Sequence, residues 1–247
     1  SVQAGATAEL SNVTVDRNHD AGVVVLDEGT EFVLTAAVVT STQPRRTDMD
    51  RGAGVVVQGA HVELAQVLLD QNHTVGVLVT ESGSAVMEDI AVLRTQPQVS
   101  DLAFGRGLHV HGGSSMSVLR GVIDGNHDIG VIGFDPGTNL QLEDIAILNT
   151  QPQRTDMADG RGLDLSDGAT AQVVRALVDG NHTVGVVAFE RGTRMTLEDV
   201  TISNTQPRVS DMSVGRGLSV QTGAEVHVTR GAFVGNHEVA IVAFDPG

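Results

Sequence analysis

Apolar and polar residues alternate over short runs throughout the chain, as in Leu140-x-Leu142 and Val226-x-Val228. A period of two is typical of β-strands, in which successive side chains point to opposite faces. The runs are rich in Val, Ile and Leu, and Gly, Asn or Asp interrupts them every few residues, as expected for tight turns. The pattern therefore predicts short strands joined by turns.

A repeat unit of about 55 residues organises these strands. The pair Asn-His recurs at intervals of 54 or 55 residues, beginning at Asn18, Asn72, Asn126, Asn181 and Asn236. Thr-Gln-Pro recurs between these pairs, beginning at Thr42, Thr95, Thr150 and Thr205. Glycines at 113, 137, 168, 192, 223 and 247 are separated alternately by 24 and 31 residues. Each unit therefore combines a plain coil with a coil that carries a Thr-Gln-Pro loop.

Strands arranged in this way predict an all-β fold, a right-handed parallel β-helix of about nine to ten coils in a two-coil repeat. A helical solenoid is the alternative, but 29 glycines and the lack of any stretch with a helical period disfavour it. We expect one domain over 1–247, with repeats at 1–54, 55–108, 109–163, 164–218 and, in part, 219–247. Ser1 aligns with Ser219 and Gly247 falls at a coil boundary, so we expect a longer solenoid or covered ends.

Stacked coils place residues at equal offsets from the coil glycine about 4.8 Å apart. One such column alternates Asn with Thr, and we expect its Asn side chains to hydrogen-bond backbone groups at the turn. A second column contains Arg120, Asp144 and Arg175, and its alternating charges predict ion pairs between neighbouring coils. The adjacent acids Glu143 and Asp144 should face opposite sides of a strand, so we interpret them as structural. We expect an interior stack of Phe134, Phe189 and Phe244 with Val110, Leu165 and Val220.

The Thr-Gln-Pro loops should line up on one side of the solenoid about 9.6 Å apart, at twice the coil rise. Each loop contains one matching Asp, and three are followed by an Arg: Asp48, Asp101 with Arg106, Asp156 with Arg161, and Asp211 with Arg216. One carboxylate per loop is too few for calcium, which takes roughly 6 to 8 oxygen ligands. We expect Asp–Arg pairs that order the loops, and a polar ridge for a repetitive ligand such as a glycan.

Histidines supply the other candidates. His127 and His182, with Gln151 on the coil between them, form a possible ligand-binding stripe, but their rings lie too far apart for one metal ion, so we predict no metal site. His109 and His111, with Asp164 one repeat later, are the irregular polar cluster and the catalytic candidates if the chain is an enzyme. Catalysis needs unlike groups that converge, whereas the repeats present like ones. We recognise no phosphate-binding, zinc or cofactor motif.

Composition narrows the partners. Hydrophobic residues make up 40% of the chain and aromatic residues 2%, so the core should be aliphatic. A net charge of -16 disfavours contact with phosphate backbones, and we expect no nucleic-acid partner. Apolar runs fall short of the roughly 18 residues that span a bilayer, so we expect neither a membrane span nor a leader in this stretch. Without Cys there are no disulfides.

The runs Gly-Arg-Gly-Leu, Val-x-Gly-Asn-His-x-Val-Gly-Val and Leu-Glu-Asp-Val-x-Ile-x-Asn-Thr-Gln-Pro resemble tandem right-handed β-helix repeats of large surface or secreted proteins of myxobacteria. The resemblance covers essentially the whole chain, and it implies a pectate-lyase-like fold and an extracellular or cell-surface location. Some β-helix relatives are polysaccharide lyases or hydrolases. Their calcium-binding carboxylates and catalytic Arg or Lys have no residue-by-residue match here, which disfavours an enzyme.

These observations favour a non-enzymatic extracellular or cell-surface repeat module. It would serve as a spacer or as an adhesive surface for a polysaccharide or another surface protein. One alternative is a carbohydrate-active enzyme, a polysaccharide lyase or hydrolase, with its site near His109, His111 and Asp164. Another is a solenoid protomer that associates end to end through its open strands.

Overall fold

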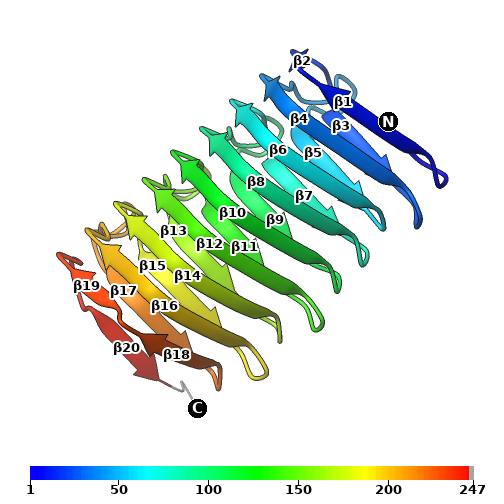
Figure 1. Ribbon diagram of the computed structural model, residues 1–247. Helices are drawn as coiled ribbons and strands as arrows, with labels where there is room; N and C mark the ends of the chain where they lie inside the picture. The colour runs from blue at the N-terminus through cyan, green and yellow to red at the C-terminus, as the bar shows by residue number, and fades with distance from the viewer. Residues whose placement is uncertain (245–247) are drawn as a thin grey trace.

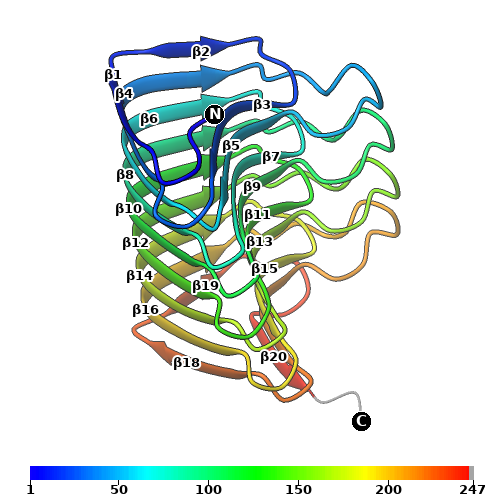
Figure 2. The same ribbon diagram turned by 90° about the vertical axis from the view of Figure 1, so that its right-hand side faces the viewer.

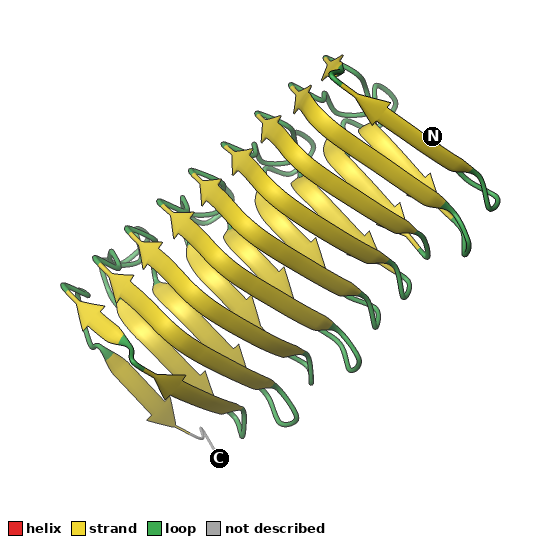
Figure 3. Cartoon of the chain, in the orientation of Figure 1, coloured by secondary structure: helices red, strands yellow, loops and turns green. Residues whose placement is uncertain are grey.

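The computed structural model describes residues 1–244, and all of its regular elements are β-strands (Figures 1 and 3). Neighbouring strands run parallel and form two sheets that extend side by side along the whole molecule. The 11-stranded sheet contains the ten-residue strands, and we call it the long-strand sheet. The 9-stranded sheet is the short-strand sheet. The all-β parallel β-helix expected from the sequence is confirmed.

The long-strand sheet consists of β1 (Thr7–Ser11), β2 (Thr14–Asp16), β4 (Glu31–Thr40), β6 (His61–Asp70), β8 (Ser84–Leu93), β10 (Ser115–Asp124), β12 (Asn139–Leu148), β14 (Thr170–Asp179), β16 (Arg194–Ser203), β18 (Glu225–Thr229) and β19 (Ala232–Val234). The short-strand sheet consists of β3 (Ala21–Leu26), β5 (Ala53–Gln58), β7 (Val75–Thr80), β9 (Arg106–Val110), β11 (Ile129–Gly133), β13 (Arg161–Leu165), β15 (Val184–Phe189), β17 (Arg216–Gln221) and β20 (Ile241–Phe244).

Each long strand from β4 to β16 bends at its sixth residue, which has a left-handed backbone. These residues are Ala36, Gln66, Asp89, Arg120, Asp144, Arg175 and Asp199, with φ between 52° and 58°. Such a conformation costs a non-glycine residue roughly 1 kcal/mol or more, so the flanking ladder must hold it in place. In β4, Phe32 and Leu34 point inward before the bend and Ala37 and Val39 after it. The fifth and sixth residues therefore both face outward.

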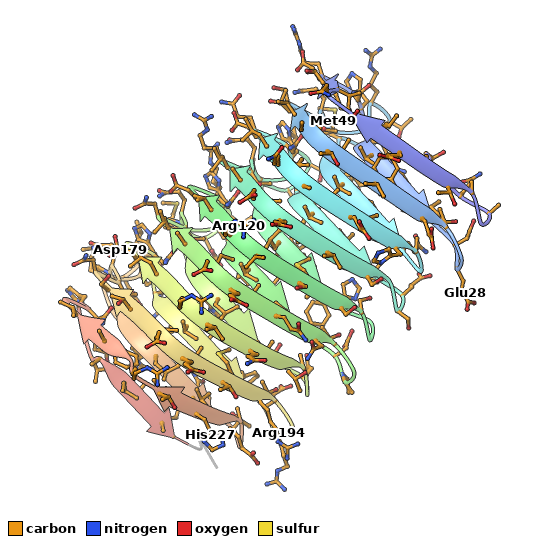
Figure 4. All side chains as sticks on the ribbon, in the orientation of Figure 1. Glu28, Met49, Arg120, Asp179, Arg194 and His227 are labelled. Atoms are coloured by element: carbon orange, nitrogen blue, oxygen red, sulfur yellow. The ribbon has the colours of Figure 1, made fainter. Side chains whose placement is uncertain are left out.

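The alignment expected for the charged column is confirmed, but the opposite facing expected for Glu143 and Asp144 is wrong. The pairing register aligns Arg120, Asp144 and Arg175 as the sequence indicates. Glu143 and Asp144 do not face opposite sides, because the bend places both outward and both bond to Arg175. The Arg175 Nε–Asp144 Oδ1 distance is 2.7 Å. Arg120 forms the same clamp with Glu88 and Asp89, on the exposed face of β10 (Figure 4).

The core between the sheets is aliphatic as expected, apart from Phe32, which is 2% exposed. The predicted interior stack of phenylalanines is wrong. The register places Gly133 beside Val110, so Phe134 points outward and stacks on the His111 ring with centroids 4.8 Å apart. The turn 134–138 is one residue longer than the turn 111–114, and this shifts every side chain upstream of the glycine. Phe189 is likewise outward, and Phe244 is 40% exposed.

The Asn column satisfies backbone groups at the corner, which confirms the expectation. Asn126 is buried, its amide donates to the Val92 carbonyl at 3.0 Å, and its oxygen accepts from the Thr95 N–H at 2.9 Å. Asn72 and Asn181 make the equivalent bonds in their own units. Each bond crosses to the preceding coil, so the column ties successive coils together.

Four connections between the sheets, which we call the long loops, span 41–52, 94–105, 149–160 and 204–215. They project from one side of the solenoid, stacked one above the next (Figure 2). The last two touch, because the Ser210 N–H donates to the Met157 carbonyl at 3.1 Å. Gly105 ends its loop with φ of +100°, and a Cβ there would lie 2.6 Å from the His127 Cβ. Close approach to the next turn thus explains the first glycine of Gly-Arg-Gly-Leu.

Within the part of the chain that the structure describes, no helix has the length and apolar character required to cross a bilayer. The coil-boundary glycine expected at Gly247 lies outside the described residues.

Candidate functional site

A cleft of about 490 Å³ lies over the outer face of the short-strand sheet, beside the long loops 149–160 and 204–215. Strands β11, β13, β15 and β17 contribute to it, so it runs along the solenoid axis across neighbouring coils. Its charged and neutral polar lining consists of Arg106, Asp128, Gln153, Asp159, Arg161, Asp164, Ser166, Thr183, Arg208, Arg216 and Gln221. Its apolar lining consists of Ile129, Ile132, Val184, Val187, Phe189 and Val214.

Three arginines expected as ligand-binding residues line this cleft, each as the first residue of an alternate strand. Arg106 opens β9, Arg161 opens β13 and Arg216 opens β17, so neighbouring arginines lie two strand spacings apart, about 9.6 Å. All three bind carboxylates. The pairs are Arg106–Asp128 at 2.7 Å, Arg216–Glu238 at 2.9 Å, Arg161–Asp159 at 2.7 Å and Arg161–Asp164 at 2.6 Å.

The carboxylate partners were missed at the sequence level, although a signal is present. The acid follows the Asn-His pair of the next coil, as Asp128 and Glu238 do. In the unit of Arg161 that position is Thr183, and there the arginine turns to Asp164 on its own strand. In two of the three units, the residue after Asn-His is thus an acid that pairs with the strand-opening Arg of the preceding coil.

Asp164 is, with Asp128, one of two buried carboxylates that line the cleft. It points outward from β13 but is only 5% exposed, because Ile132 and Val187 flank it on the neighbouring strands. Burial raises the pKa of Asp164 above its usual range, while the guanidinium of Arg161 acts in the opposite direction. Burial also raises the pKa of Asp128, opposed by Arg106. A proton on either carboxyl would leave its arginine less neutralised.

The expected pairing of loop Asp with strand-opening Arg is wrong. Asp101, Asp156 and Asp211 instead cap their own loops, each accepting the backbone N–H two residues later at 2.9 to 3.0 Å. Asp211 also binds Arg208 three residues earlier, as Asp48 binds Arg45. The backbone N–H groups of the local turn outcompete the more distant strand-opening arginine for the loop Asp, because they lie beside its side chain.

The histidine candidates are separated from Asp164. His109 and His111 lie with ring centroids 5.0 Å apart, and His109 lies 5.4 Å from Phe134. His111 lies 3.7 Å from Asp135. Asp164 is two strands from His109, with Ile132 between them in the register, so the structure does not bring the three catalytic candidates together.

Burial, followed by the charges of Arg106 and His111, lowers the pKa of His109 to about 3. His109 is therefore neutral at physiological pH. Among residues 1–244 its buried Nε2 has no hydrogen-bond partner. A neutral, enclosed imidazole among aromatic rings suits packing better than acid–base catalysis near neutrality.

The His and Gln stripe lies at the corner between the sheets, and its side chains are largely engaged. His127 and His182 each place Nδ1 3.0 Å from the carbonyl of a threonine on the preceding coil, which assigns the proton to Nδ1. Gln151 donates to the Asn149 carbonyl at 2.7 Å. His127 is 9% exposed, so the stripe offers a ligand less than its sequence suggests.

Across residues 1–244, no three His, Asp or Glu side chains come together in a way that could hold a metal ion. What the cleft offers instead is a row of hydrogen-bonding groups above an apolar floor.

The two sheets, the corner ladder and the loop-bordered outer face define a right-handed parallel β-helix. A family described as the right handed beta helix region matches residues 1–206, and the chain belongs to this family. The resemblance to surface proteins of myxobacteria stays a prediction. No curated protein matches the chain in sequence.

Two solved structures show a distant likeness. An alginate lyase from Paenibacillus sp. str. FPU-7 is 10% identical, with a TM-score of 0.33 over 96% of this chain and 88% of that chain. HetL, a pentapeptide repeat protein involved in heterocyst differentiation regulation from the cyanobacterium Nostoc sp. strain PCC 7120, is 12% identical, with a TM-score of 0.22 over 83% and 92%. Neither likeness carries information about activity.

Proposed function

We propose that the chain is a non-enzymatic extracellular or cell-surface repeat module that binds a polysaccharide on its loop-bordered face. The observation that carries the proposal is the cleft of about 490 Å³, which runs along the axis and is lined by equivalent residues on alternate coils. A polymer laid along that axis would meet Arg106, Arg161 and Arg216 in turn. Another surface protein is the second kind of partner that such a face fits.

The arrangement of charged groups supports binding over catalysis. Each strand-opening arginine is held by a carboxylate, and His109 lies away from Asp164. Reacting groups that converge on one bond are therefore not evident in the cleft. The repeat resemblance to secreted and surface proteins supports the extracellular location.

A polysaccharide panel tests this function. Affinity electrophoresis should show binding to at least one polymer, and the same incubation should release neither reducing ends nor unsaturated sugar products. Replacing Arg216 by Ala should weaken binding, whereas Arg175→Ala on the long-strand sheet should not, since Arg175 lies outside the cleft. Failure to bind any polysaccharide would contradict the proposal.

One observation favours a carbohydrate-active enzyme as the second candidate. Asp128 and Asp164 both line the cleft, and burial raises the pKa of each, so either carboxyl could serve as the proton donor that a glycoside hydrolase needs beside a second carboxylate. If the chain cleaves a polysaccharide, Asp164→Asn should reduce product release at least a hundredfold, about the contribution of a general acid. Binding without product would rule this candidate out.

A further inference from the structure

Acidic groups slightly outnumber basic groups around the cleft. Four arginines line it, and the carboxylates in ion pairs with them are Asp128, Asp159, Asp164, Asp211 and Glu238. Four positive charges thus face five negative ones, within a chain of net charge -16. An anionic ligand would add negative charge to a site where acidic groups already outnumber basic ones, and it would approach against the field of the whole molecule.

Uncharged hydrogen-bonding groups are well supplied. Gln153, Ser166, Thr183 and Gln221 line the cleft. The two glutamine amides donate to Thr155 and Ser219 and the Thr183 hydroxyl donates to the Asp159 carbonyl, so the glutamine carbonyl oxygens can accept from a ligand. Hydroxyls can also donate to the paired carboxylates without disrupting the ion pairs.

The floor of the cleft is apolar and has an aromatic ring at one side. Ile132 and Val187 are 7% and 4% exposed, and Phe189 closes β15 with its ring partly exposed in the cleft. Phe189 is outward for the same reason as Phe134, but Phe134 stacks on His111 and does not line the cleft. Sugar rings present apolar C–H faces that pack on such surfaces.

We propose that the cleft binds a neutral, hydroxyl-rich polysaccharide in preference to an acidic one. This inference rests on the proposed function and specifies its ligand class. Hydroxyl groups meet the paired arginines and the glutamines, while a ring face packs on Phe189 and Val187.

Calorimetry with chain-length-matched oligosaccharides tests the preference. Neutral probes are the hexamers of β-1,4-linked glucose, mannose and xylose, and acidic probes are hexamers of galacturonate and of alginate. We expect at least one neutral hexamer to bind about tenfold or more tightly than either acidic one. Its dissociation constant should change less than about twofold between low and physiological salt, because no net charge is neutralised.

Variants localise the effect. Phe189→Ala should weaken neutral binding about three- to tenfold, the contribution of one aromatic contact, whereas Phe134→Ala should leave it unchanged. Circular dichroism should confirm that both variants are folded. Tighter, salt-sensitive binding of an acidic hexamer would overturn the inference while leaving polysaccharide binding intact. Absence of binding to every probe would overturn both, and equal losses in the two Phe variants would show that the ligand does not occupy the cleft.

Discussion

His109 shows what a single outward position on the short-strand sheet can become when its neighbours enclose it. Flanked by His111 and Phe134, it is held neutral with a pKa of about 3, against an ordinary value of 6.5. Unfolding restores the ordinary value, so below pH 6.5 the unfolded chain takes up a proton that the folded chain excludes. His109 therefore does not reduce the free energy of unfolding above pH 6.5, and it reduces that free energy progressively as the pH falls toward about 3.

We predict that His109→Phe removes this acid sensitivity. At pH 5 the histidine should cost about 2 kcal/mol relative to pH 8, and the phenylalanine, among aromatic neighbours, should not. Urea unfolding at the two pH values measures the difference. Val86→Phe, at an exposed position of the long-strand sheet, is the control and should leave the difference between pH 5 and pH 8 as in the parent, because it changes no titratable group. If His109→Phe is as acid-sensitive as the parent, the imidazole is not enclosed.

Asp164 should act with the opposite sign. Its pKa is raised in the folded state, so its contribution to stability is full below the unfolded value near 3.8 and is lost as the pH rises through the folded value. We predict that Asp164→Asn, which cannot ionise, loses less stability than the parent as the pH rises over this window. Chemical denaturation at closely spaced pH values checks it. Parallel curves for the two proteins would mean that Arg161 fully offsets the burial of the carboxylate.

At the scale of elements, the bend in each long strand is a site of stored strain. Gln66 has φ of +57°, is exposed and makes no ion pair within residues 1–244. Its replacement therefore reports the free-energy cost of the left-handed backbone alone. We predict that Gln66→Gly stabilises the protein by roughly 0.5 to 1 kcal/mol, since glycine adopts this region freely. Glu63→Gly, three residues earlier on the same strand and in extended conformation, should destabilise by a similar amount. Thermal unfolding compares them, and destabilisation by both variants would show that the bend is unstrained.

The same bend marks where sequence reasoning stopped. Coil length, strand stacking and the Asn column followed from periodicity alone, because each depends on spacing that repeats. The direction of Glu143 and the outward turn of Phe134 did not, since a left-handed residue and a one-residue change of turn length each shift the alternation without altering the repeat. The sequence places Arg106, Arg161 and Arg216 in one column. The carboxylates that pair with Arg106 and Arg216 come from turns of the next coil, which only the coil register brings near.

At the scale of the whole molecule, end-to-end association stays a prediction that charge can test. A chain of net charge -16 repels its copies at low salt. At 0.1 M ionic strength the Debye length is about 10 Å, so the repulsion between copies is largely screened beyond that distance. If strand edges pair between copies, we expect the mass from small-angle scattering to rise with both protein concentration and salt. A constant monomer mass under all of these conditions would contradict association.

Because the long loops repeat, substitutions in one loop and in several loops should affect polysaccharide affinity differently. Asp156 caps one loop by accepting the Ala158 N–H, and Asp101 and Asp211 do the same in the neighbouring loops. If binding is distributed along the axis, Asp156→Ala should weaken polysaccharide affinity less than about threefold, because the other loops retain their shape. Replacing all three should weaken it more than about tenfold, whereas Glu63→Ala on the opposite sheet should have no effect. Loss of binding in Asp156→Ala alone, with folding intact, would instead place the ligand at a single loop.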